Sequence, residues 1–247
     1  MSKIESKSES ESKPISEIYD RYTVEIAFRD KIYGGIPKDP SVMINWLVSR
    51  AKMTKEEAKE KAAKIAEEVK SDPEALEKGV TTFKRDIDGL YIEERQVKAM
   101  LREAAQTTGL LSKYGMRDLI AHAMFTRPDK TGKIHLLRDG KKIVEEDGFE
   151  ERALHVMTPR GPRDALKRGM YVEKPHVSFT LLVTKPVFKP KPKTEQEDPK
   201  PKKPVSPQAI EEETLHTLFQ VAQEIGLGAD RSQGEGKFDL IRFEAIH

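Results

Sequence analysis

The most regular hydrophobic pattern along the chain is an alternation of apolar and polar residues. In RYTVEIAFRD, Val24, Ile26 and Phe28 fall on one face, which is typical of a strand with one side buried. HVSFTLLV, beginning at residue 176, and KFDLIRFEAI, beginning at residue 237, show the same two-residue period. These three segments predict the main strands of a sheet.

Two other segments have the period of a helix. EERQVKAMLREAAQ gathers Val97, Met100, Leu101 and two alanines on one face, and we expect it to pack against the sheet. Residues 206–226 show a similar apolar face, and Gly226 suits the end of that helix. Residues from about 41 to 79 predict a helical insertion, whose lysines and glutamates four residues apart indicate a solvated surface.

Shorter patterns fill the middle of the chain. TTFKRDIDGLYI predicts a hairpin around its Asp-Gly turn. AHAMFT, KIHLL and ALHVMT each fit a strand. The segment at about residues 155–175 contains PRGPRDALKRGMYVEKP, which is basic and rich in turn residues, and it predicts a projecting loop or hairpin.

The two segments of lowest complexity lie outside this pattern. Residues 1–17 are polar and are expected to form a disordered tail, and residues from about 186 to 205 form a linker rich in proline and lysine. The remainder, residues 18–247, is expected to be a single domain. Its order of strands and helices predicts an α+β fold, a ferredoxin-like (RRM-like) β-α-β-β-α-β sandwich with insertions.

Composition narrows the chemistry. The 247 residues include no cysteine, which excludes disulfides and thiolate metal sites, and the six histidines are scattered without a metal-binding spacing. We therefore expect neither a metal nor a cofactor. The formal net charge of +2 argues neither for nor against a nucleic-acid partner. With a polar N-terminus and no long apolar run, the chain is expected to be cytoplasmic and without a membrane partner.

The segment GLGADRSQGEGKF, residues 226–238, joins the last predicted helix to the last predicted strand. Its four glycines can expose successive backbone N–H groups, and Arg231, Ser232 and Lys237 add side-chain donors. Such a loop suits phosphate or sugar and does not read bases. Two plainer interpretations stay open: a flexible turn, or a loop that Arg231 and Ser232 pin against the first helix.

This loop resembles the glycine-rich loop of the RAMP superfamily, which has the form GxGxxRSxGxGxF. A second segment, DGLYIEERQVKAMLREAA, resembles the family's xYIPGSSLKGxLR pattern, with Tyr91, Ile92, Lys98, Leu101 and Arg102 at the matching places. The chain departs from that pattern at residues 93–96, where Glu-Glu-Arg-Gln replaces Pro-Gly-Ser-Ser. The two carboxylates would repel a polyanion, which puts an RNA-backbone role for this helix in question.

The resemblance implies an RNA-binding subunit of a CRISPR effector complex, or a mobile-element relative of one, for antiviral defence. Its partners would be single-stranded RNA, including a guide RNA, and other subunits or copies of the chain itself. The basic projecting segment would correspond to the family's thumb, or it is a solvated loop. The implied RNA-binding residues are Lys98, Arg102, Arg160, Arg163, Lys167, Arg168, Gly228, Arg231, Ser232, Gly234, Gly236 and Lys237.

Catalysis is the remaining question. Some relatives are endoribonucleases that use a histidine near the first strand or helix, but no histidine precedes His122 here. Others use an aspartate after the first strand, for which Asp39 is the candidate, although an aspartate in a proline-rich loop is also a common turn former. We favour binding without catalysis. The alternatives are a metal-dependent endoribonuclease of this fold and a structural or assembly protein whose loop makes protein contacts.

Overall fold

The structure is a computed structural model, and it describes residues 18–37, 39–50, 52–68, 80–110, 116, 119–127, 133–158, 161–185 and 210–246. The predicted tail, residues 1–17, and the predicted linker at about residues 186–205 lie outside the described residues. In chain order the elements are β1 (Tyr19–Phe28), β2 (Lys31–Tyr33), β3 (Ile36–Pro37), α2 (Pro40–Arg50), α3 (Lys55–Glu68), β4 (Val80–Thr82), β5 (Lys84–Arg85), β6 (Leu90–Glu93), α4 (Glu94–Thr107), a π-helical turn (Leu119–Ala123), β7 (Met124–Arg127), β8 (Lys133–His135), β9 (Leu137–Arg138), β10 (Lys141–Lys142), β11 (Gly148–Thr158), β12 (Gly161–Glu173), β13 (His176–Thr184), α7 (Glu212–Ile225), a 3₁₀ turn (Arg231–Gln233) and β14 (Phe238–Ala245).

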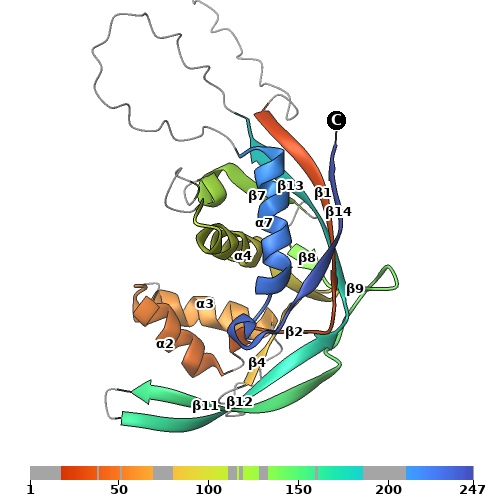
Figure 1. Cartoon of the computed structure of the whole chain (residues 1–247). Coiled ribbons are helices and arrows are strands. Elements are labelled where there is room, and N and C mark those ends of the chain that lie inside the picture. The colour runs from red at the N-terminus through yellow and green to blue at the C-terminus, as the bar shows by residue number, and fades with distance from the viewer. Residues whose placement is uncertain are drawn as a thin grey trace, which may run out of the picture.

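The main sheet and two helices form the predicted sandwich. Its central strands lie in the order β14, β1, β13 and β7, and each is antiparallel to its neighbour. Helix α4 stands between β1 and β7 in the sequence, and α7 stands between β13 and β14. Both helices cover the same face of the sheet (Figure 1). This arrangement confirms the α+β, ferredoxin-like fold.

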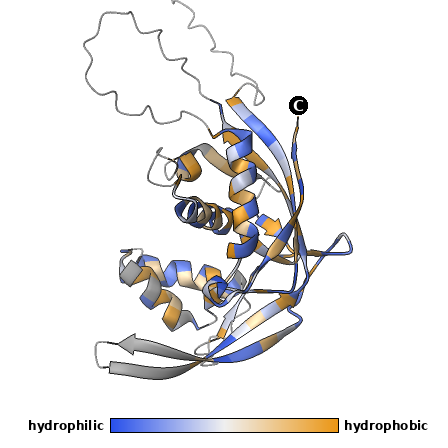
Figure 2. Ribbon diagram, in the orientation of Figure 1, coloured by the Kyte–Doolittle hydropathy of each residue, from blue (hydrophilic) through white to orange (hydrophobic). Residues whose placement is uncertain are grey.

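The alternation in the sequence explains which face is buried. Val24 and Ile26 of β1 are fully buried against the helices. Leu101 of α4 and Phe219 of α7 are buried in the same core. The residues between the apolar positions of β1 are more exposed, and Figure 2 shows hydrophobic and hydrophilic residues interspersed along this strand. One sheet face and two helix faces thus supply most of the core.

A second sheet is built on a long hairpin. Strands β11 and β12 pair from Gly148 opposite Tyr171 to Thr158 opposite Gly161, and β12 also pairs with β2 and β4. The hairpin leaves the body of the molecule beneath α2 and α3 (Figure 1). It contains the described part of the predicted projecting segment at about residues 155–175. Most of its described residues therefore belong to the two strands of a hairpin rather than to an irregular loop.

The helical insertion and the Asp-Gly turn also form elements. Helices α2 and α3 pack on each other around a small core of their own, which includes Met43, Leu47 and Ala58. Strands β5 and β6 pair across the turn at Asp88 and Gly89, as the pattern predicts, and β8 extends this small sheet.

One predicted helix is shorter than expected. Within the predicted span 206–226, α7 begins at Glu212, with Glu211 in an extended conformation as its N-cap. Ile210 precedes the helix but is buried against the same core, which explains why it fits the apolar periodicity. Gly226 ends the helix with a positive φ of 85°, as the sequence predicts.

Candidate nucleic-acid interface

The glycine-rich loop, residues 226–238, lies against β2. The N–H of Ala229 donates to the carbonyl of Tyr33 at 3.0 Å, and the N–H of Gly236 donates to the carbonyl of Lys31 at 3.1 Å. The N–H of Leu227 also donates to the carbonyl of Gly236 at 2.9 Å, which closes the loop on itself. The loop is therefore a hydrogen-bonded element and not a floppy turn.

The three glycines that are predicted to bind RNA differ in the space around them. A Cβ on Gly236 would lie 2.0 Å from the carbonyl oxygen of Leu227, and one on Gly228 would lie 2.7 Å from the side chain of Ile32. These two close approaches are to the chain itself. Gly234 also has a positive φ, 88°, but a Cβ there would meet no atom within 4 Å. Of the three, Gly234 leaves open space in which a ligand could approach the backbone.

Arg231 pins the loop to the first helix of the sandwich. Its guanidinium lies 2.9 Å from the carboxylate of Glu103 on α4. The Nη1 atom of Arg231 is buried without a hydrogen-bond partner among the described residues. Ser232, next in the chain, is exposed. The expected pinning of the loop thus falls to Arg231, while the Ser232 hydroxyl faces solvent.

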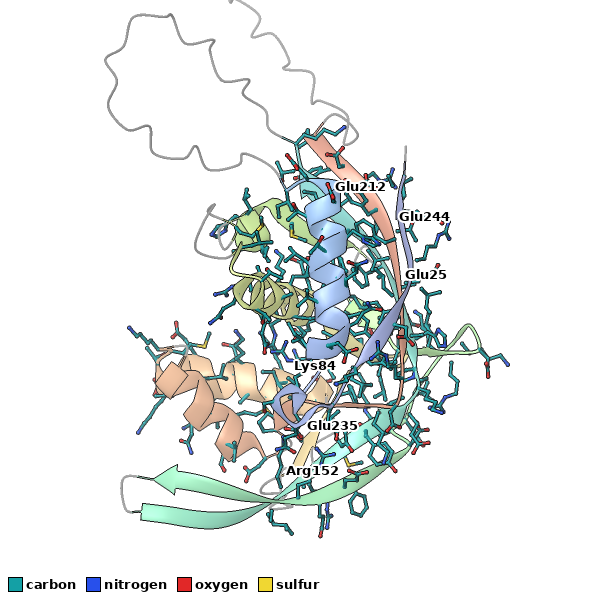
Figure 3. The ribbon with its side chains drawn as sticks, in the orientation of Figure 1. Glu25, Lys84, Arg152, Glu212, Glu235 and Glu244 are labelled. Carbon is teal, nitrogen blue, oxygen red and sulfur yellow. The ribbon has the colours of Figure 1, made fainter. Side chains whose placement is uncertain are left out.

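Two ion pairs fasten the β11–β12 hairpin to the same loop. Lys167 of β12 donates to the Asp230 carboxylate at 2.5 Å, and Arg152 of β11 donates to Glu235 at 2.6 Å. Arg152 also donates to the side-chain oxygen of Gln233 at 3.0 Å. Figure 3 shows Arg152 on the hairpin and Glu235 on the loop close to each other. We call this set of contacts the hairpin clamp.

The clamp extends into β2 through Glu150. The Tyr33 hydroxyl donates to the Glu150 carboxylate at 2.6 Å, and Arg152 donates to the same oxygen at 3.0 Å. Lys31 donates to the other carboxylate oxygen. The hydrogen bonds from Lys31, Tyr33 and Arg152 lower the pKa of Glu150 to about 2. Burial and the bond to Glu150 raise the pKa of Tyr33.

The predicted interface includes none of Tyr33, Glu150, Arg152 and Glu235. A signal for Arg152 exists in the pairing: in the hairpin register it lies directly opposite Lys167. Two like charges in directly opposed positions destabilise a hairpin unless carboxylates take them up. That register becomes available only once the hairpin has been recognised as one.

Helix α4 holds its two predicted cations differently. Lys98 lies 2.6 Å from the carboxylate of Glu94, one turn earlier, and 4.7 Å above the ring of Phe125. Glu94 in turn accepts a hydrogen bond from the backbone N–H of Thr126. Arg102 is half-buried, and its Nε has no hydrogen-bond partner among the described residues. The unusual carboxylate at Glu94 therefore neutralises Lys98 and joins α4 to β7.

The other predicted cations lie on the hairpin and at the end of the glycine-rich loop. Arg168 donates through Nε to Glu151 at 3.0 Å and stacks 4.4 Å from the ring of Phe149. Lys237 lies 3.0 Å from Glu224 of α7. Arg160 lies outside the described residues, as does the side chain of Arg163 in β12. Five predicted cations therefore pair with carboxylates of the chain itself, namely Lys98, Lys167, Arg168, Arg231 and Lys237.

Asp39, the catalytic candidate, lies at the start of α2. It is 3% exposed, and its Oδ1 accepts hydrogen bonds from the backbone N–H of Ser41 at 2.7 Å and from its hydroxyl at 2.6 Å. Its carbonyl accepts from the N–H of Met43. This is the geometry of a residue that caps a helix.

Another group of acidic and histidine side chains, Asp86, Asp88 and His135, lies near the β5–β6 turn. Lys133 donates to Asp86 at 3.0 Å, and His135 Nε2 lies 3.0 Å from the same carboxylate. Lys142 donates to Asp88 at 2.8 Å. These contacts, together with backbone N–H donors, hold the pKa of Asp86 below its usual value despite partial burial. A lysine ammonium therefore already provides the positive charge at this group.

Comparison with known proteins finds a structural likeness but no match in sequence. No family model matches the sequence, and no curated protein matches it. Among solved structures, the chain is similar to a chain in a cryo-electron microscopy structure of the type III-B Cmr-beta complex bound to cognate target RNA, with a TM-score of 0.46 and 14% identity. That match covers 94% of this chain but 62% of the other. Within the described residues, no helix has the length and apolar character needed to cross a membrane.

Proposed function

We propose that the chain is an RNA-binding, RAMP-like subunit of a CRISPR-type ribonucleoprotein complex, gripping the backbone of a guide RNA without reading its bases. One observation carries the proposal: the glycine-rich loop contacts both α4, through Arg231 and Glu103, and the β11–β12 hairpin, through Lys167 and Asp230. Three separate predicted RNA-binding segments therefore converge on one surface.

The ion pairs of the predicted cations differ in how readily a phosphate could replace the carboxylate. The side chains of Lys237 and Glu224 are 42% and 61% exposed, and those of Arg168 and Glu151 are 45% and 40% exposed. Exposed pairs of this kind contribute only about 0–1 kcal/mol, so a phosphate can recruit the cation at little cost. Together with Ser232 and the open space at Gly234, Arg168 and Lys237 are the accessible donors.

The other cations are better suited to hold the surface in shape. The side chains of Lys167 and Asp230 are 19% and 13% exposed, and those of Arg231 and Glu103 are 24% and 48% exposed. Separating Lys167 from Asp230 would leave a largely buried carboxylate without its counter-charge, which costs more than breaking an exposed pair. Within the proposal, Lys167 and Arg231 therefore orient the hairpin and the loop, and the exposed cations meet the RNA.

A salt titration tests this function. Filter binding of a 20-nucleotide single-stranded RNA should show affinity that falls steeply with salt, because each neutralised phosphate releases counterions. Affinities for RNAs of unrelated sequence should agree within about threefold, since phosphate contacts carry no base information. Absence of binding at 50 mM salt, or a flat salt dependence, would rule the proposal out.

One observation favours a second candidate, a structural or assembly protein. Five predicted cations already have carboxylate partners within the chain, namely Lys98, Lys167, Arg168, Arg231 and Lys237. A purely structural loop would show the same pairing. Under this alternative the purified protein binds no RNA, and the Arg231–Glu103 pair matters only for stability. The endoribonuclease alternative has less support, because the buried carboxylate of Asp39 is occupied in capping α2.

A further inference from the structure

A cavity of about 570 Å³ separates the helical insertion from the sandwich. The residues that line it come from the segment after β2, from α2 and α3, and from β5, β6 and the first turn of α4. The volume falls within the range of about 300–1,000 Å³ that is usual for small-ligand sites. The apolar residues that line it are Ile36, Pro37, Met43, Leu47 and Ile65.

Charged groups also line the cavity, and positive ones predominate. Lys61, Lys84 and Arg95 line it together with a single carboxylate, that of Glu93. Lys61 is exposed on α3 and forms no ion pair with any described residue. A ligand that matches this lining must combine an apolar body with a negative group.

Glu93 holds the arginine in a defined position. Arg95 donates through Nε to one carboxylate oxygen of Glu93 at 2.8 Å, and its Nη2 lies 2.7 Å from the same oxygen. The other oxygen lies 3.3 Å from the ammonium of Lys84. A guanidinium fixed in this way loses little conformational freedom when a planar group stacks on it.

We propose that this cavity receives one nucleotide of a bound single-stranded RNA, with the base against the aliphatic side chains and the phosphate between Lys61 and Arg95. Bases that are not paired stack on guanidinium planes and on apolar side chains, and their phosphates need nearby cations. An acidic amphipathic helix has the same chemistry but needs a groove that accommodates anchors over several helical turns. The size of the cavity therefore favours the nucleotide.

The location agrees with the proposed function, on which this inference rests. Glu93 and Arg95 flank the first residue of α4, and Lys98 stands one turn further along the same helix. A nucleotide in the cavity would thus be at the start of the helix whose other residues belong to the predicted RNA-binding surface. The insertion would have the specific role of closing one wall around this nucleotide.

Fluorescence of 2-aminopurine tests the site directly, with the free ribonucleoside 5′-monophosphate and with a 12-nucleotide oligouridine that carries one such base. The test variants are Lys61→Glu and Arg95→Ala, and the matched control is Lys59→Glu, which alters an exposed lysine of α3 that does not line the cavity. Both test positions are exposed, and thermal melting of each variant confirms that it is folded.

We expect the monophosphate signal to saturate with the wild type and the control, and its affinity to fall about tenfold in each test variant, as for loss of a charge-assisted contact. If RNA binds but the monophosphate does not, or if the variants bind it like the wild type, the cavity site is wrong and the proposed function stands. If the monophosphate binds but RNA does not, the proposed function is wrong instead. Binding of a labelled, glutamate-rich amphipathic helical peptide with leucines three and four residues apart, with no nucleotide binding, would assign the cavity to a protein partner.

Discussion

Lys167 of β12 and Asp230 of the glycine-rich loop are 63 residues apart in sequence, yet the lysine ammonium donates to the carboxylate at 2.5 Å. Both side chains are less than one-fifth exposed. Asp230 also has a left-handed backbone conformation, with a φ of 58°, which aspartate and asparagine adopt more readily than most residues. The loop backbone thus presents Asp230 to the hairpin.

A double-mutant cycle measures this contact. We expect Lys167→Met and Asp230→Asn each to lower the free energy of unfolding, and the pair to show a coupling energy of about 1–2 kcal/mol, as for a partly buried charged hydrogen bond. Asparagine keeps the backbone conformation, so its effect reports the lost charge. Urea denaturation of the four proteins provides the values. Additive effects of the two changes would show that the Lys167–Asp230 pair contributes nothing to the attachment of the hairpin.

Variants of the Arg231–Glu103 pair distinguish a role in stability from a role in RNA binding. Arg231→Ala should weaken the fold by about 1 kcal/mol, because it removes a partly buried side chain and its ion pair with Glu103 of α4. The exchanged variant, Arg231→Glu with Glu103→Arg, should recover much of that stability through the reversed ion pair. RNA affinity, measured by filter binding on the same preparations, should follow stability if Arg231 only orients the loop.

The competing expectation, direct contact between Arg231 and phosphate, gives a different result. The exchanged variant would then regain its melting temperature but bind RNA at least as weakly as Arg231→Ala, because a carboxylate would occupy the contact point. The partial burial of Arg231 and its bond to Glu103 lead us to expect the first outcome.

Much of the main sheet could be predicted because its strands bury one face. Val24, Ile26 and Phe28 must all point to the same side of a strand, and a shift by one residue would expose all three. By contrast, the pattern places the strand of AHAMFT only in part, because its first three residues lie in a π-helical turn and the strand itself, β7, begins at Met124. The pairing of β7 with β13 is a tertiary contact that no local pattern contains.

The candidate site was predictable in position but not in charge balance. The glycines and basic residues of the loop are visible in the sequence, whereas Glu103, Glu224 and Glu235 resemble any other surface glutamates until folding places each beside a cation. Ion pairs between distant segments depend on the register of the hairpin and on the path of the loop. The sequence alone therefore does not show which of these cations have carboxylate partners in the folded chain.

The glycines provide a third prediction, which contrasts two neighbouring positions. Gly236→Ala should destabilise the fold by about 3 kcal/mol or more, because its Cβ would lie 2.0 Å from a carbonyl oxygen and its φ is 72°. Gly234→Ala should cost only about 1–2 kcal/mol for its positive φ, since nothing lies within 4 Å. Thermal melting of the two variants side by side checks the difference. Equal losses would mean that backbone conformation alone selects these glycines.

Acid should weaken the hairpin clamp through Glu150. Hydrogen bonds from Lys31, Tyr33 and Arg152 lower the pKa of its carboxyl from about 4.5 to about 2 in the folded protein. A group with a lowered folded pKa stabilises fully above its unfolded pKa, and that contribution disappears as the pH falls towards the folded value. The stability advantage of the wild type over Glu150→Gln should therefore be constant above about pH 5 and shrink steadily between pH 4.5 and 2.

Urea denaturation of both proteins at a series of pH values measures this advantage directly. Glu145→Gln is the matched control, because Glu145 is exposed on the same segment and has no ion pair among the described residues. Other carboxylates also titrate in acid, but they do so equally in wild type and variant, so the difference isolates Glu150. If the advantage over Glu150→Gln does not change with pH, Glu150 supports the clamp through its shape and hydrogen bonds and not through its charge.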